Sequence, residues 1–256
     1  MSTTRFENGV TNQKPGMPLG DMGQMDPTLF LSYFNDFLAF NSADWTKTAT
    51  GAATAALESG YGGLLLITNS AGAADLVSLQ QIAAPFGILA VPPALDMWFA
   101  AQFALSDATN CQFAIGLQEI NANPFAATDG LWFQKAAATT NLDFHCMAAS
   151  SDNPVLDIAQ LVSATMVSVG FYISMTKQRI KLFVNGLQVP GIDKPLPTLT
   201  SANLALVMAM KNADAVANTL TVDYIGAFSE RPQINDPTYA GRIAGYFGPQ
   251  MGNLPG

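Results

Sequence analysis

Large apolar side chains alternate with small or polar ones along two long segments of the chain. Residues 97–105 and 111–118 carry Met, Phe, Ala, Cys, Ile or Leu at every second position. A period of two is typical of a β-strand that buries one face. Many short strands separated by turns predict an all-β sandwich of two antiparallel sheets. Further strand patterns lie at 53–58, 63–68, 75–80, 131–135, 142–148, 166–175, 179–184, 187–189, 204–210 and 220–228.

Local signals add a hairpin and two helical segments. Asn185-Gly186 separates two strand patterns, and this dipeptide predicts a tight β-hairpin. Asp26-Pro27 has the residue types of a helix start, a cap followed by proline. The segment 154–163 is predicted to form one or two helical turns. Large apolar residues after Asp26-Pro27 have spacings of three and four and predict one short amphipathic helix: Phe30, Phe34, Phe37 and Leu38.

The two ends of the chain show no periodicity. Residues 1–26 and 230–256 are rich in Gly, Pro and polar residues, which is typical of extended arms, whereas 27–229 form the helix and sandwich domain. An ordered arm needs hydrogen bonds and apolar contacts, so we expect the arms to bind a partner. The alternative is that they pack on the chain's own sheet. The predicted partner-binding residues are Phe6, Met17, Leu19, Met22, Tyr239, Arg242, Tyr246, Phe247 and Met251.

Charge is scarce in this chain. Charged residues make up 12% and hydrophobic residues 49%, and 19 acidic against 11 basic residues give a net charge of -8. No basic residue lies between Lys47 and Lys135, so phosphate-mediated binding of nucleic acid is not expected. The hydrophobic half excludes a disordered chain. We expect a surface so poor in charge to be covered by other subunits.

The cysteines and the apolar runs indicate in which cellular compartment the protein is made. Cys111 and Cys146 lie in alternating segments beside phenylalanines, which favours buried free thiols over a disulfide. No apolar run has the length of a membrane span, and no signal peptide pattern precedes the domain. We therefore expect a protein made in the cytoplasm with no membrane partner.

Four segments resemble a known family. The segment 123–135 (NPFAATDGLWFQK) resembles a stretch of concanavalin A-like, lectin/glucanase-type sandwiches encoded by tailed bacteriophages. In matching order, 97–103 (MWFAAQF) resembles the long strand before it, 181–186 (KLFVNG) a hairpin, and 220–225 (LTVDYI) the closing strand. Together they cover roughly residues 44–228. The resemblance implies a concanavalin A-like jelly-roll fold, and in phages such sandwiches are similar to capsid decoration or cement proteins.

This resemblance leads to a functional prediction. We expect a non-enzymatic structural protein on the capsid surface of a phage virion, made in the host cytoplasm and working without a cofactor. It would bind the major capsid protein and neighbouring copies of itself, and so form a homo-oligomer on the capsid. The alternative is a lectin-like module that binds glycans of the host surface. No nucleic acid and no membrane are expected as partners.

Catalytic and metal sites are not expected. The glucanases that this fold resembles use acids in the form Glu-x-Asp-x-Glu, and in the similar stretch 119–123 (EINAN) both later acids are amides. Glu119 is then a solvated strand end. Asn121, Asn123 and Asp129 offer too few oxygens for calcium, which takes six to eight. His145, the single histidine, shares a strand face with Asp143 and is expected to be a surface or interface imidazole, with a pH-sensitive contact as its functional form.

Aromatic residues are the candidates for glycan binding. Trp45, Trp98, Trp132 and Tyr172 could serve either as core or as platforms for a sugar. Alternation places Trp98 opposite Met97, Phe99 and Phe103, on the outer face of its strand. Trp98 and Trp132 are therefore the predicted glycan-binding or interface aromatics.

Overall fold

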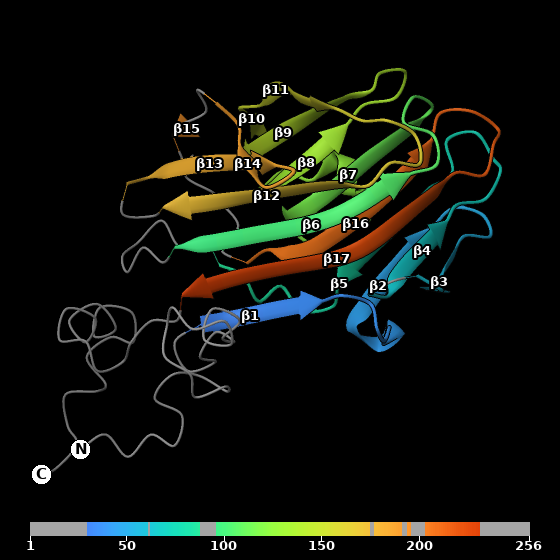
Figure 1. Ribbon diagram of the computed structural model, residues 1–256, viewed down its shortest axis with the longest axis horizontal. Coiled ribbons are helices and arrows are strands. Elements are labelled where there is room, and N and C mark those ends of the chain that lie inside the picture. Colours follow the sequence, from blue (N-terminus) through green and yellow to red (C-terminus); the bar gives the residue numbers. More distant parts are fainter. Residues whose placement is uncertain are drawn as a thin grey trace, which may run out of the picture.

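Two antiparallel sheets stacked face to face make up the structure (Figure 1). The structure is a computed structural model, and it describes residues 30–60, 62–87, 96–174, 177–190, 194–195 and 203–230. These residues form one sheet of nine strands and one of eight. The predicted all-β sandwich is confirmed. The described part of the chain contains no helix that could span a membrane.

The nine-stranded sheet has the order β14-β13-β12-β6-β17-β4-β3, with β1 also pairing with β17 and β15 with β13. The two longest strands of the sheet, β6 and β17, lie side by side at its centre (Figure 1). Its strands are β1 (Phe30–Asn35), β3 (Thr54–Glu58), β4 (Leu64–Thr68), β6 (Met97–Leu105), β12 (Val167–Ser174), β13 (Arg179–Val184), β14 (Leu187–Gln188), β15 (Lys194–Pro195) and β17 (Thr219–Glu230).

The eight-stranded sheet has the order β10-β9-β8-β7-β16-β5-β2, and β11 pairs with β9. Two short 3₁₀ turns, η1 (Ser42–Asp44) and η2 (Pro124–Ala126), lie in loops. The strands of this sheet are β2 (Trp45–Ala49), β5 (Leu76–Gln81), β7 (Cys111–Gln118), β8 (Gly130–Lys135), β9 (Asn141–Ala148), β10 (Ser151–Asp152), β11 (Val155–Gln160) and β16 (Ala205–Asn212).

The predicted helix near the N-terminal end of the domain is wrong. Residues Phe30–Asn35 form β1, which pairs antiparallel with the second half of β17. Tyr33 packs against the core and meets Trp45 edge-on at a ring distance of 6.0 Å, whereas Phe34 lies on the outer face with 56% of its surface exposed. The spacing of the phenylalanines fits a helix, but the open edge of β17 offers a row of backbone partners. Sheet pairing over the length of that edge therefore replaces the local helix.

The predicted helical turns at 154–163 are also wrong. Val155–Gln160 form β11, which pairs with β9 through a bulge. At the bulge Asp157 has a φ of 57°, and its backbone N–H donates to Oδ1 of Asp143 at 2.7 Å. The irregular register hides the period of two in the sequence, because the bulge shifts the side chains to the other face.

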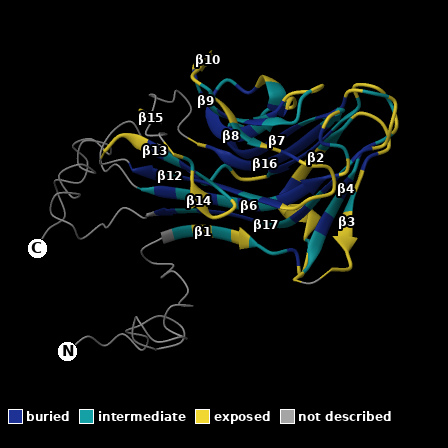
Figure 2. Ribbon diagram, turned by 45° about the horizontal axis from the view of Figure 1, so that its top comes forward, coloured by how far each residue is buried: buried dark blue, intermediate teal, exposed yellow. Residues whose placement is uncertain are grey.

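Buried side chains from both sheets meet in one core. Figure 2 shows the buried residues in dark blue on strands of both sheets. Its centre is aromatic: Phe133 of β8 lies 5.2 Å from Phe144, 6.4 Å from Phe99 and 6.2 Å from Phe171, measured between ring centroids. Phe99 and Phe171 belong to the opposite sheet, so these rings join the two layers. The large apolar residues at every second position of β6 and β7 are buried as predicted, but β7 is buried on its other face as well and is therefore not the half-buried strand that was predicted.

The cysteine and hairpin predictions are also confirmed. Cys111 and Cys146 are free and buried. Asn185 and Gly186 connect β13 to β14 with φ angles of 50° and 74°, the left-handed conformation that this turn requires. The turn is held to β12 because the Asn185 side chain accepts a hydrogen bond from the Ser168 backbone at 3.0 Å.

Candidate functional site

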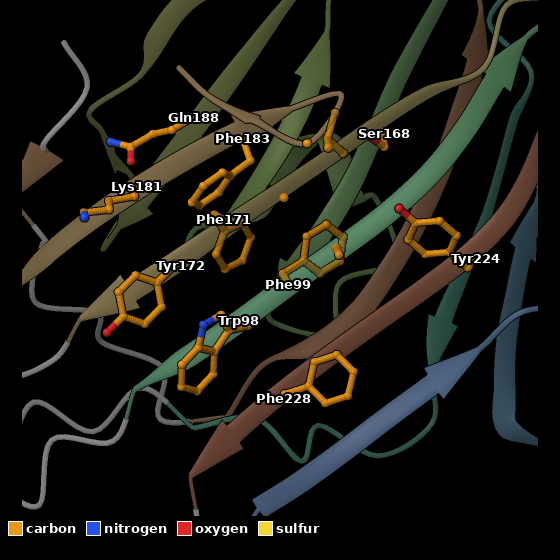
Figure 3. A pocket seen from close by; sticks show the side chains of 14 residues that line it. Trp98, Phe99, Ser168, Phe171, Tyr172, Lys181, Phe183, Gln188, Tyr224 and Phe228 are labelled. Carbon is orange, nitrogen blue, oxygen red and sulfur yellow. The ribbon is translucent and has the colours of Figure 1, made fainter. Parts of the chain in front are cut away.

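The outer face of the nine-stranded sheet is hollowed over β6, β12 and β13 (Figure 3). The hollow has a volume of about 390 Å³. Its floor consists of small residues, since Gly170 of β12 pairs with Ala100 of β6, and Gly226 of β17 continues the row on the far side. A Cβ atom on Gly226 would lie 2.8 Å from the Phe34 ring, so the glycine leaves room for the aromatic side chains around it.

Aromatic side chains form the walls of this hollow. The sheet register aligns Tyr172, Trp98 and Phe228 in one row across β12, β6 and β17. The rings of Trp98 and Tyr172 are stacked with centroids 5.1 Å apart, and both side chains are half-buried. Phe183 and Tyr224 close the two ends (Figure 3). We call this surface the aromatic hollow.

A second aromatic contact extends the aromatic hollow toward β1. Phe34 stacks on Tyr224 at 5.9 Å and on Phe228 at 6.5 Å between ring centroids. Because Phe34 is largely exposed, it adds an apolar wall that water can reach. The strand β1, which the sequence pattern presents as a helix, thus contributes directly to this surface.

Polar groups lie at the rim of the aromatic hollow. The Tyr172 hydroxyl donates a hydrogen bond to Asp96, which fixes the position of its ring. Burial raises the pKa of the Tyr224 phenol and the charge of Asp223 raises it further, so this hydroxyl stays protonated at neutral pH and can donate. Among the described residues that line the hollow, the other polar side chains are Ser168, Lys181 and Gln188.

The prediction for Trp98 and the prediction for Trp132 have different outcomes. Trp98 lies on the outer face, half-exposed, as its alternation predicts. Trp132 is 1% exposed, and its indole N–H donates to Gln134 at 2.9 Å. It packs with Ala114, Val207, Ala209 and Ala127 in a small cluster on the outer side of the eight-stranded sheet. The prediction of Trp132 as an exposed platform is therefore wrong.

The loop between β7 and β8 explains this burial. It contributes Ala127 and Phe125 to the cluster around Trp132. Glu119 holds the loop closed, because its carboxylate accepts hydrogen bonds from the Thr128 backbone at 2.7 Å and from the Thr128 hydroxyl at 2.8 Å. The prediction of Glu119 as a solvated strand end is therefore wrong, because Glu119 is a half-buried hydrogen-bond acceptor. The sequence does not reveal this, since contacts nine residues apart depend on how the loop folds.

The amide oxygens considered for calcium serve the same loop. Oδ1 of Asn121 accepts from the Asn123 backbone at 2.9 Å, and Oδ1 of Asn123 accepts from the Phe125 backbone at 3.2 Å. Asp129 is 3% exposed and accepts from the Ala149 backbone at 3.3 Å. The two asparagine contacts are turn caps, whereas the Asp129 contact joins the loop to the residue after β9. Among the described residues, no group of three or more His, Cys, Asp or Glu side chains could hold a metal ion.

His145 pairs with a different acid from the one expected. Its Nδ1 lies 2.6 Å from Oδ2 of Asp152, which β10 places beside β9. Asp143 instead accepts the hydrogen bond from Asp157. The His145 ring lies nearly parallel to the Trp132 ring, 5.6 Å away, so it forms part of the closed outer face of the eight-stranded sheet.

The arm residues predicted to bind a partner lie outside the described residues. They comprise Phe6, Met17, Leu19 and Met22 at one end, and Tyr239, Arg242, Tyr246, Phe247 and Met251 at the other. Their role stays a prediction. The same holds for the boundaries at 1–26 and 230–256.

Known structures share the fold of this chain. An endo-1,3-beta-glucanase from Streptomyces sioyaensis has a TM-score of 0.59 at 12% identity, covering 82% of this chain and 100% of its own. A protein of unknown function from Shewanella oneidensis MR-1 has a TM-score of 0.56 at 14% identity, covering 85% of this chain and 97% of its own. The Lotus tetragonolobus seed lectin has a TM-score of 0.55 at 7% identity, covering 79% of this chain and 100% of its own. No protein-family model and no curated protein sequence matches.

These similarities establish the architecture. The chain has the concanavalin A-like sandwich fold that it shares with lectins and glucanases, as predicted. Sequence identities of 7% to 14% establish a shared fold and do not establish a shared function. Because proteins that bind sugars and proteins that cleave them both have this fold, the prediction of a non-enzymatic protein stays a prediction.

Sequence reasoning missed part of the candidate site. Phe34, Phe183, Tyr224 and Phe228 were not predicted as functional residues. The strands that contain these residues were predicted, with the exception of β1. The arrangement of the four side chains on one surface, however, depends on which strands are neighbours in the sheet. A signal was available in the outward positions of 179–184 and 220–228, which carry aromatic residues where an exposed sheet usually carries polar ones.

Proposed function

We propose that this chain is a non-catalytic carbohydrate-binding protein and that the aromatic hollow is its binding surface. One observation carries the proposal: stacked, half-exposed aromatic rings surround a floor of small residues on an open sheet face. Ligand sites combine an apolar surface with a few polar groups in this way. The non-catalytic part of the proposal rests on the lining of the hollow, since no carboxylate is among its described lining residues and glycoside hydrolysis requires two.

The chemistry of a pyranose ring fits this surface. One or both faces of such a ring present C–H groups, whereas its edges carry hydroxyls. The face of an aromatic ring is negative and attracts polarised C–H groups. The stacked pair Trp98 and Tyr172 therefore offers an apolar platform, and Ser168 and Gln188 can bind the hydroxyls at the edge. The floor of Gly170 and Ala100 leaves space for the ring.

Replacing Trp98 by alanine is expected to weaken saccharide binding at least tenfold, which corresponds to about 1.4 kcal/mol. The substitution removes the largest stacking surface of the aromatic hollow. Binding is measured on an array of neutral and acidic oligosaccharides, followed by calorimetry with the saccharides that bind the unaltered protein. Circular dichroism confirms that the variant is folded, and Trp98→Phe is expected to retain most of the affinity.

Trp132→Phe is the matched control, because Trp132 lies buried on the other sheet. It is expected to leave saccharide binding unchanged. If no oligosaccharide binds the unaltered protein, or if Trp98→Ala binds as well as that protein, the aromatic hollow is not a carbohydrate site.

A second candidate function is the decoration or cementing of a phage capsid. The specific observations in its favour are the resemblance of the segment 123–135 to phage-encoded sandwiches and several large apolar side chains that are exposed on the described surface, which suit contacts between subunits. The partners would be the major capsid protein and neighbouring copies of this chain. The most exposed of these side chains are Leu38, Leu156, Val162 and Leu187.

Sedimentation with purified heads of the source phage tests this second function. The chain is expected to pellet with the heads at a fixed number of copies per capsid, because contacts repeated across subunits raise the overall affinity. A chain that stays monomeric and in the supernatant would exclude it. The carbohydrate proposal does not depend on the outcome.

A further inference from the structure

Lys181 lies at one end of the aromatic hollow. It stands opposite Tyr172 in the register of β13 and β12, and Tyr172 stands opposite Trp98 of β6. Figure 3 shows its amine beside the Tyr172 ring, at the edge of the hollow. Among the described residues that line this surface, Lys181 is the only one with a charge.

The Lys181 amine has no carboxylate partner within the described part of the chain. The ion pair found there joins His145 and Asp152, on the other sheet. Asp96, which directly precedes β6, accepts a hydrogen bond from the Tyr172 hydroxyl. Lys181 as a residue is half-buried, and within the described part of the chain no ion pair supplies a counter-charge to its amine.

The rest of the chain makes this placement unusual. It has 11 basic residues against 19 acidic ones, so most of its field repels an anion. Adjacent strands are about 4.8 Å apart, so a sugar stacked on Tyr172 and Trp98 lies about one strand from Lys181. A carboxylate on the edge of that sugar would come within reach of the Lys181 amine, whose four-carbon stem is flexible.

We infer that the saccharide bound in the aromatic hollow is a carboxylated sugar and that Lys181 donates hydrogen bonds to its carboxylate. The inference rests on the proposed carbohydrate function and adds the class of ligand. Two kinds of sugar carry this chemistry, uronic acids and sialic acids. The stacked rings of Trp98 and Tyr172 bind the apolar face of the sugar, and Lys181 favours a sugar that carries a negative charge.

The test compares acidic oligosaccharides with neutral counterparts in calorimetry on the full chain. Hexuronic acid oligomers and sialylated oligosaccharides are measured separately, each beside the same molecule after reduction of its carboxyl to an alcohol. The unaltered protein is expected to bind the acidic form of one kind at least tenfold more tightly. This preference is expected to shrink at high ionic strength, because salt screens an exposed ion pair.

Lys181→Met is expected to reduce binding of the acidic sugar to the level of its reduced counterpart, while binding of the reduced sugar changes less than twofold. Lys181→Arg is expected to keep the preference. Lys211→Met, which removes one positive charge from β16 of the other sheet, is the matched control and is expected to leave both affinities unchanged.

Equal binding of acidic and reduced sugars by the unaltered protein would overturn this inference and leave the carbohydrate proposal standing. The same conclusion follows if Lys181→Met weakens both sugars equally. If neither form of any saccharide binds, both the inference and the proposed function are wrong.

Discussion

Replacing Phe133 by alanine is expected to lower the free energy of unfolding by about 3–5 kcal/mol. Phe133 has no exposed surface, and its ring contacts Phe144 in its own sheet and Phe99 and Phe171 in the opposite one. Alanine would leave a cavity at the point where the sheets meet. Because folded domains have a total stability of about 5–15 kcal/mol, this loss is a large share of it.

Denaturant titration followed by circular dichroism measures this loss. Phe133→Leu fills most of the space and is expected to cost clearly less than the alanine variant. Phe228→Ala is the matched control, since this phenylalanine is half-exposed on the outer face of β17 and its removal leaves no closed cavity. Equal losses for Phe133→Ala and Phe228→Ala would show that Phe133 does not join the two layers.

The strands that bury one face could be predicted from the sequence. In β6 and β7 every second side chain enters the core, so the period of two is preserved over the whole strand. Prediction failed where pairing is irregular or depends on a distant partner. β11 is interrupted by a bulge, and β1 becomes a strand because β17 is long enough to extend beyond β4 and present a free edge.

The candidate site was only partly predictable for the same reason. Alternation places Trp98 on an outer face, but whether that face is open depends on the loops that fold over it. The loop between β7 and β8 covers Trp132, whereas the described residues leave Trp98 and Tyr172 half-exposed. The row that unites Tyr172, Trp98 and Phe228 is created by the strand order, which combines residues far apart in the sequence.

Stability is also expected to fall between about pH 9 and pH 11, because of one buried thiol. Burial raises the pKa of the Cys111 thiol from 9.0 to about 11, the charges of Asp107 and Asp214 act in the same direction, and Lys135 opposes them. The thiol also donates a hydrogen bond to the Asp107 carbonyl at 2.8 Å, which favours its protonated form. Below pH 9 both the folded and the unfolded chain hold this proton. Between the two pKa values only the unfolded chain releases it.

The contribution of Cys111 to this loss is about 2.7 kcal/mol, since each pH unit between the two pKa values lowers the free energy of unfolding by about 1.4 kcal/mol. Lys135 acts in the opposite direction, because burial lowers its pKa and the folded chain releases that proton first. Burial raises the pKa of Tyr33 and of Tyr224, which adds to the loss above about pH 10. These three residues remain in a Cys111 variant, so comparing the variant with the unaltered protein isolates the thiol together with its coupling to Lys135, whose pKa the charge of Cys111 raises.

Cys111→Ser nearly keeps the size of the side chain and replaces the thiol donor by a hydroxyl, which does not ionise in this range. The measurement is a series of denaturant titrations from pH 8 to pH 11, on the unaltered protein, Cys111→Ser and Cys111→Ala. Both variants are expected to be less stable than the unaltered protein at pH 8 and to lose less stability as the pH rises, so that the difference narrows between pH 9 and pH 11. The prediction is wrong if the free energy of unfolding falls with pH to the same extent in all three proteins. That result would mean that folding does not raise the pKa of the Cys111 thiol and that its surroundings near Asp107 and Lys135 are open to water.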